Sequence, residues 1–158
     1  MGERDFKKAG GVNISRVFFI VSNSTASASE LTINNLRPYM DVKLIGDTTY
    51  GKPVGFFPIT ISNFDIYPIS FRTINSAGSA DYYSGFAPDK LSADGVDKDW
   101  GDVTEPCLAE ALKYISSGSF RSLPENNTQE LRRQAQLEMK PVQKLLEDKR
   151  FTGMYLKK

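Results

Sequence analysis

The sequence contains no histidine, and this absence excludes more chemistry than any other feature of its composition. Serine and cysteine hydrolases that use imidazole as their base need a histidine, and so do zinc sites built on imidazole ligands. Such sites are excluded within this chain. Any hydrolytic chemistry in its 158 residues must use another base, such as an amine or a carboxylate.

Cysteine, net charge and long apolar runs are also scarce. The single Cys107 cannot form an intramolecular disulfide, and its helix-like surroundings favour a buried apolar role. Twenty basic residues against nineteen acidic ones leave no field that would attract nucleic acid or anionic lipid. No stretch suits a signal peptide or a membrane span. We therefore expect a soluble chain with no nucleic-acid partner and no membrane span.

The first ordered pattern predicts a strand, a tight turn and a helix. Residues 17–21 (VFFIV) form a continuous apolar run typical of a buried strand. Apolar residues then recur at helical spacing from about Ala26 until Pro38, and residues 42–45 (VKLI) indicate a second strand. The order strand, helix, strand favours two parallel strands joined by a right-handed crossover. The fold class is therefore predicted to be α/β.

The rest of the chain predicts a hairpin, a second helix and a tail. Residues 56–62 and 66–74 alternate in polarity on either side of Asn63 to Asp65, which indicates a hairpin. A helix is expected after Thr104, its predicted N-cap, with an end at Gly118. Its predicted apolar stripe consists of Leu108, Ala111, Leu112 and Ile115. The composition becomes more charged after Ser119, so we predict one domain over residues 1–118 and a peripheral helical tail over 119–158.

The polar turn after the first strand carries the first candidate for chemistry, Ser27. Backbone amides and the dipole at the start of a helix stabilise developing negative charge, which suits a nucleophile. The alternative is purely structural, because Ser27 and Glu30 have the S-x-x-E spacing of a capping box. Spacing alone favours the capping interpretation.

Lys52 is the second candidate. It follows the second predicted strand, and the carboxyl ends of adjacent parallel strands lie side by side, so Lys52 can reach the turn that carries Ser27. An amine acts as a base near neutral pH only when apolar neighbours remove water from it. Four nearby side chains could do so: Tyr50, Val54, Phe56 and Phe57. The alternative is an ordinary solvated loop lysine.

Two other segments resemble binding motifs but do not match them, so we expect no cofactor and no metal. Residues 46–52 (GDTTYGK) resemble a phosphate-binding loop, but Pro53 replaces the Ser or Thr that would hold magnesium, and a strand pattern follows where a helix is required. The acidic residues over 94–102 lack the spacing of a calcium loop. We therefore interpret the acidic segment as a solvated loop.

The segment over residues 15–55 resembles the signature region of the S41 peptidases, also called C-terminal processing or tail-specific proteases. In that family the nucleophile is the serine central to an S-A-S-E run, which falls on Ser27. The base is the lysine of a T-x-G-K loop, which falls on Lys52. The resemblance further implies that the backbone N–H of Ala28 is an oxyanion donor. A Ser-Lys dyad needs no histidine, in agreement with the composition.

The resemblance continues loosely to Ile115 and implies a fold and a function. The implied core is a β/α spiral similar to crotonase and Clp protease. The implied function is a serine endopeptidase with a peptide or protein substrate, in the periplasm or cell envelope. The chain would be the C-terminal part of the catalytic domain, because the family carries a PDZ module and a glycine-rich strand upstream.

One departure from the family pattern leaves alternatives open. Many members have a glutamine that orients the lysine where this chain has Phe56, so the third catalytic residue is not identified. One alternative is a non-catalytic module that binds a peptide or another ligand on the same fold. Another is a structural unit that forms a homodimer through exposed apolar edges.

Overall fold

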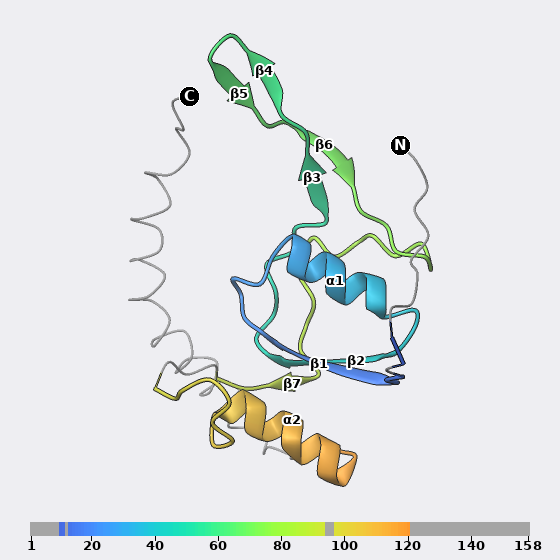
Figure 1. The fold of residues 1–158 in the computed structure, drawn as a ribbon, viewed down its shortest axis with the longest axis vertical. Helices are drawn as coiled ribbons and strands as arrows, with labels where there is room; N and C mark the ends of the chain where they lie inside the picture. Colours follow the sequence, from blue (N-terminus) through green and yellow to red (C-terminus); the bar gives the residue numbers. More distant parts are fainter. Residues whose placement is uncertain (1–9, 12, 94–96, 121–158) are drawn as a thin grey trace.

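A computed structural model describes residues 10–11, 13–93 and 97–120, and Figure 1 shows its fold. Most of the predicted tail over 119–158 lies outside the described residues. Within the described part of the chain, neither helix is long and apolar enough to cross a membrane.

The body is a parallel three-stranded sheet with a helix on each face (Figure 1). Its elements are β1 (Arg16–Val21), α1 (Ala28–Leu36), β2 (Asp41–Gly46), β7 (Lys90–Leu91) and α2 (Pro106–Ser117). The strand order is β1-β2-β7, so the strand that follows α1 pairs directly with the strand that precedes it. The predicted parallel strand-helix-strand unit is confirmed, and with it the α/β class.

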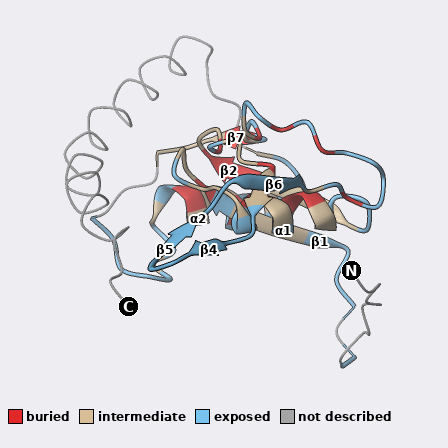
Figure 2. Cartoon of the chain, turned by 90° about the horizontal axis from the view of Figure 1, so that it is seen from above, coloured by how far each residue is buried: buried red, intermediate tan, exposed pale blue. Residues whose placement is uncertain are grey.

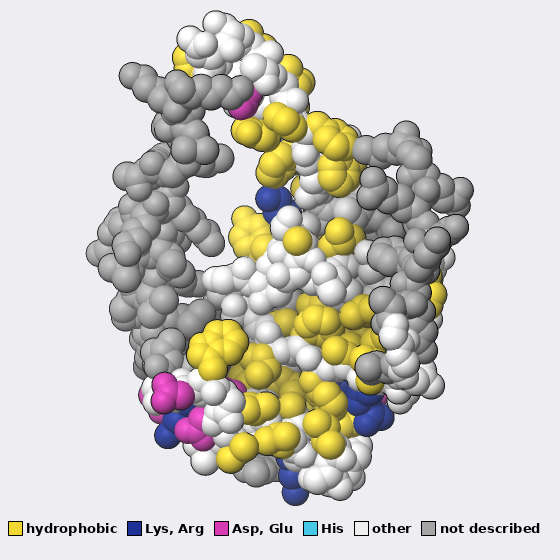
Figure 3. Space-filling view, in the orientation of Figure 1, with side chains coloured by type: hydrophobic (Ala, Val, Ile, Leu, Met, Phe, Trp, Pro, Cys, Tyr) yellow, Lys and Arg dark blue, Asp and Glu magenta, His cyan; other side chains and the backbone are white. Residues whose placement is uncertain are grey.

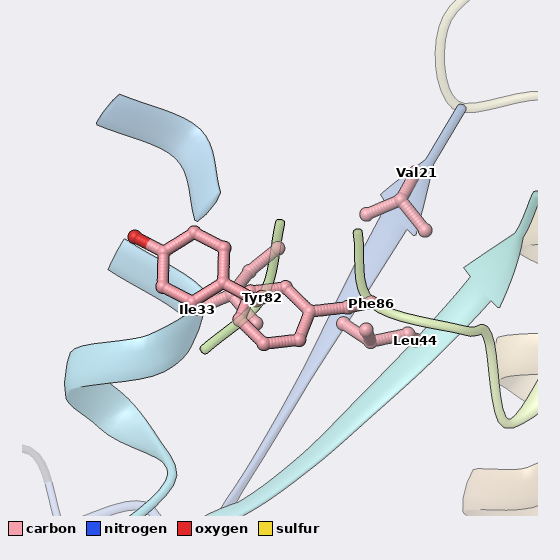
Figure 4. Close-up of a cluster of buried hydrophobic side chains, with 5 residues drawn as sticks. All are labelled: Val21, Ile33, Leu44, Tyr82 and Phe86. Atoms are coloured by element: carbon pink, nitrogen blue, oxygen red, sulfur yellow. The ribbon is translucent and has the colours of Figure 1, made fainter. Parts of the chain in front are cut away.

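The core lies on both faces of β2, because successive strand residues point to opposite sides of a sheet. Leu44 and Ile45 are both fully buried, one toward each helix. On the α1 side, Figure 4 shows one apolar cluster, formed by Val21, Ile33, Leu44, Tyr82 and Phe86. On the α2 side a smaller cluster contains Ile45, Cys107 and Ala111. Cys107 is fully buried, as its surroundings in the sequence predict.

A β arm, residues 54–72, projects from the body as two successive two-stranded sheets (Figure 1). Its strands are β3 (Val54–Phe56), β4 (Ile59–Ile61), β5 (Phe64–Ile66) and β6 (Ile69–Arg72). β3 pairs antiparallel with β6, and β4 with β5. The arm is exposed along nearly its whole length, as the pale blue strands in Figure 2 show. Figure 3 shows that many of its side chains are apolar.

Two expectations about burial are wrong. The apolar run in β1 is not a buried strand, since only Val21 is buried and Ile20 is 46% exposed. The reason is topology: β1 is an edge strand of the described sheet. In α2, Leu112 and Ile115 are 40% and 62% exposed, because the helix packs on the sheet mainly through Cys107 and Ala111.

The predicted end of α2 is confirmed, whereas its predicted start is off by one residue. Gly118 adopts the left-handed conformation with φ 74°, which a glycine tolerates best at a helix end. The N-cap is Glu105 rather than Thr104. The Glu105 carboxylate accepts hydrogen bonds from the amides of Cys107 and Leu108, at 2.9 and 2.6 Å. A carboxylate satisfies two helix amides where the threonine hydroxyl would satisfy one.

Candidate active site

Ser27 lies in a strained turn between β1 and α1. Its φ of 55° and ψ of −112° place it at positive φ, which is uncommon for residues other than glycine and costs on the order of 1–3 kcal/mol. The turn before it is closed by Thr25, whose amide donates to Ser22 O at 2.9 Å and whose hydroxyl accepts from Ser22 N at 3.0 Å. A serine on a sharp turn from a strand into a helix has the local geometry of a nucleophile elbow.

Glu30 is a fully buried carboxylate that accepts four hydrogen bonds. Its Oε2 accepts from Ser27 N at 3.0 Å, which is the glutamate half of the predicted capping box, and from Lys52 N at 2.8 Å. Its Oε1 accepts from the Thr49 hydroxyl at 2.6 Å and from Gly51 N at 2.7 Å. Hydrogen bonds to a buried ionised group are among the stronger ones in proteins. One side chain therefore connects the turn that carries Ser27, the serine turn, to the loop that carries Lys52, the lysine loop.

Further bonds hold the lysine loop against the same turn. Tyr50 N donates to Thr25 O at 2.9 Å, which joins the two segments directly through their backbones. Thr49 is fixed from its other side by Phe86, whose amide donates to the Thr49 hydroxyl at 2.7 Å and whose carbonyl accepts from Thr49 N at 3.1 Å. The loop that carries Lys52 is thus anchored on both sides before it enters the β arm.

Gly51 allows this loop to pass close to a neighbouring turn. Its φ is 91°, and a Cβ at this position would lie 2.2 Å from Tyr83 O. Gly85, across the contact, has φ 77° and would place a Cβ 1.9 Å from Thr49 O. Two backbones therefore approach each other here at a distance that only glycine permits. The position of Lys52 depends on this close approach.

The Lys52 side chain is half-buried and points toward an aromatic ring. Its Nζ lies 5.1 Å from the centroid of the Phe56 ring. Other residues expected to shield the amine are open to solvent: Tyr50 is 63% exposed and Phe57 46%. The described residues show no hydrogen bond between Ser27 Oγ and Lys52 Nζ, so the dyad stays a prediction. Their loops are held together, but the reacting atoms are not bonded.

Ala28, the predicted oxyanion donor, is the first residue of α1 and is exposed. Within the described part of the chain its amide donates to no acceptor, and an unpaired first-turn N–H can receive the oxygen of a ligand. The role of Ala28 stays a prediction. Its position at the amino end of a helix of nine residues suits a developing negative charge.

The charged residues near the sheet whose pKa values are shifted lie toward the amino ends of β1 and β2, whereas this site lies at the carboxyl ends. Asp41 begins β2, and the Arg16 hydrogen bond, followed by that of Lys43, holds the pKa of its carboxyl below the usual value. Among the described residues, no group of three or more His, Cys, Asp or Glu side chains is placed to hold a metal ion.

One solved structure that resembles the chain is described as "Putative S41 protease from Bacteroides fragilis". The two share 31% sequence identity with a TM-score of 0.61 over 66% of this chain. The chain is related to the S41 proteases. It spans 28% of the length of that S41 neighbour. No protein-family model and no curated protein matches the chain.

Sequence reasoning located Ser27 and Lys52 but missed how Glu30 joins them. The S-x-x-E spacing signals only the local bond from Glu30 to Ser27 N. The bonds from the lysine loop to Glu30 cross about twenty residues of sequence, so only the fold reveals them. A glutamate three residues after the candidate serine was the one available signal.

Proposed function

We propose that the chain carries the nucleophile and base of a serine endopeptidase related to the S41 proteases. Ser27 would be the nucleophile and Lys52 the base. The observation that carries this proposal is the buried Glu30, which holds the backbones of Ser27 and Lys52 through adjacent hydrogen bonds of 3.0 and 2.8 Å to one oxygen. A fixed spacing between nucleophile and base lowers the entropic cost of bringing them together with the substrate.

The proposed reaction begins when Ser27 Oγ attacks a peptide carbonyl while its proton passes to Lys52 Nζ. The carbonyl oxygen gains negative charge, and the Ala28 N–H at the start of α1 would stabilise it. Collapse of this intermediate expels the amine, which takes the proton from Lys52 and leaves an acyl group on Ser27. Water then attacks the ester while Lys52 accepts its proton, and Lys52 returns this proton to Ser27 Oγ as the acid product leaves.

The resting structure must adjust before this reaction can start. The Lys52 amine contacts Phe56 and is not bonded to Ser27 Oγ. Catalytic hydrogen bonds are often long or absent before substrate binds, so a change of the Lys52 rotamer is compatible with the proposal. This movement involves only side-chain torsions, because the Lys52 backbone is held by Glu30.

We infer two broader properties from the same relationship and a third from the exposed apolar surface. The finer fold would be the ClpP/crotonase-like β/α spiral, with the exposed edge of β1 extended by further strands. The protein would act in the periplasm or cell envelope, which cell fractionation would test. The apolar β arm and the β1 edge could support a homodimer, and light scattering that gives a monomer at every concentration would contradict this.

The proposal is tested by hydrolysis of quenched fluorescent peptides with four proteins. The unaltered chain and Ser29→Ala should cleave, because Ser29 is a neighbouring exposed serine with no proposed role. Ser27→Ala and Lys52→Met should lose about a hundredfold or more in kcat/KM. Equal rates in Ser27→Ala would refute the nucleophile assignment. Peptide binding without any hydrolysis would instead support the non-catalytic module.

A further inference from the structure

Both the backbone and the side-chain amine of Lys52 are restrained in the structure. At one end, the Lys52 amide donates to the buried Glu30 carboxylate at 2.8 Å. At the other, the Lys52 Nζ lies 5.1 Å from the Phe56 ring centroid, within the usual range of a cation–π contact. The side chain therefore extends from the loop held by Glu30 to the base of the β arm.

The Phe56 ring is itself held in place. Its edge contact with the Tyr67 ring has a centroid separation of 5.5 Å and an interplanar angle of 75°, the T-shaped arrangement that aromatic pairs prefer. Phe56 also belongs to β3, which pairs with β6 through a register irregularity between Gly55 and Phe56. Such an irregularity re-aims a strand side chain, here at the point where the arm leaves the lysine loop.

An aromatic ring restrains an amine differently from a carboxylate. The negative face of the ring attracts the ammonium, but the ring cannot accept the proton or form a salt bridge. Within the described residues Lys52 forms no salt bridge with any Asp or Glu. The contact with Phe56 thus limits where the amine lies and opposes its movement toward Ser27 Oγ.

We propose that Phe56 restrains the Lys52 amine in a resting position at the base of the β arm, from which the amine must turn to reach Ser27 Oγ. This inference rests on the proposed function for its catalytic consequence, although the contact itself does not. Phe57 provides a matched control, because it is the next residue, has the same side chain and is equally exposed, at 46% against 45%. Its ring contacts Phe71 instead.

The contact is tested first by the proton chemical shift of the Lys52 ε-methylene group in the full chain. Ring current from Phe56 should move this signal upfield in the unaltered protein. The shift should disappear in Phe56→Leu, persist in Phe56→Trp and remain in Phe57→Leu. An unchanged signal in Phe56→Leu would overturn the proposal without any reference to catalysis.

The consequence is tested by the rate at which a fluorophosphonate probe labels Ser27. Loss of an exposed cation–π contact should speed labelling about two- to fivefold in Phe56→Leu, with a return to the slower rate in Phe56→Trp. An unchanged or slower rate in Phe56→Leu would overturn the restraining role. If the unaltered chain is not labelled at all, the proposed function fails, and the methylene shift alone then decides whether Phe56 holds Lys52.

Discussion

Replacement of Glu30 by glutamine tests how much the hydrogen bonds between the Ser27 turn and the Lys52 loop contribute to the stability of the fold. The carboxylate accepts two hydrogen bonds at each oxygen, from Ser27 N and Lys52 N on one side and from Thr49 and Gly51 on the other. Glutamine has the same shape but only one accepting oxygen. Two of the four donors must then face an N–H group in a site that excludes water.

The two orientations of the amide differ in cost. With its NH₂ toward Thr49, the Thr49 hydroxyl can accept a bond in place of the one it donated, and Gly51 N is left without an acceptor. With its NH₂ toward the other pair, both Ser27 N and Lys52 N are left unpaired. An unsatisfied buried donor costs about 1–3 kcal/mol, and the remaining bonds lose their charge assistance. We expect Glu30→Gln to lower the free energy of unfolding by roughly 2–4 kcal/mol.

Urea denaturation followed by circular dichroism measures this loss, and the labelling rate of Ser27 reports the site. Glu105→Gln is the control, because Glu105 is also a carboxylate that accepts two backbone amides, at the start of α2. It should cost about 1 kcal/mol and leave the Ser27 labelling rate unchanged. A Glu30→Gln protein within about 0.5 kcal/mol of the unaltered chain would refute the reasoning.

Two further substitutions test the loop and the strand ends. Gly51→Ala forces a methyl group against Tyr83 O, so it should lower the free energy of unfolding by about 1–3 kcal/mol and slow Ser27 labelling. Gly78→Ala is the control, because Gly78 has a similar φ of 80° but open space around it, so its loss measures backbone strain without a clash. Equal losses in the two variants would contradict the role of the close approach. The lowered pKa of Asp41 means that its carboxylate stabilises the fold above its unfolded pKa of 3.8, and this contribution is lost as pH falls through the lower folded value. Melting temperatures should therefore fall more steeply below pH 3.8 in the unaltered chain than in Asp41→Asn, and parallel curves would contradict the ion pair with Arg16.

The fold was predictable where local patterns determine structure. The parallel strand-helix-strand unit and the end of α2 at Gly118 follow from apolar periodicity and turn chemistry, and the structure has both. Burial was less predictable, because it depends on which elements lie beside each other. The apolar β1 sequence suits a central strand, yet β1 lies at a sheet edge. Likewise, no periodicity shows that Leu112 faces outward.

The candidate site was predictable only in part. The position of Ser27 before a helix and that of Lys52 after a parallel strand follow from the sequence, and the structure brings their backbones to one carboxylate. The reach of Glu30 and the contact between Lys52 and Phe56 depend on how the loops fold together. Local spacing contains no information about such long-range hydrogen bonds.

The central claim, that Lys52 activates Ser27, is tested most directly by mass spectrometry after reaction with a fluorophosphonate probe. Our account predicts an adduct on Ser27 in the unaltered chain and in Ser29→Ala. It predicts labelling about a hundredfold or more slower in Lys52→Met. An adduct on another serine, or the same rate of Ser27 labelling in Lys52→Met, would contradict it.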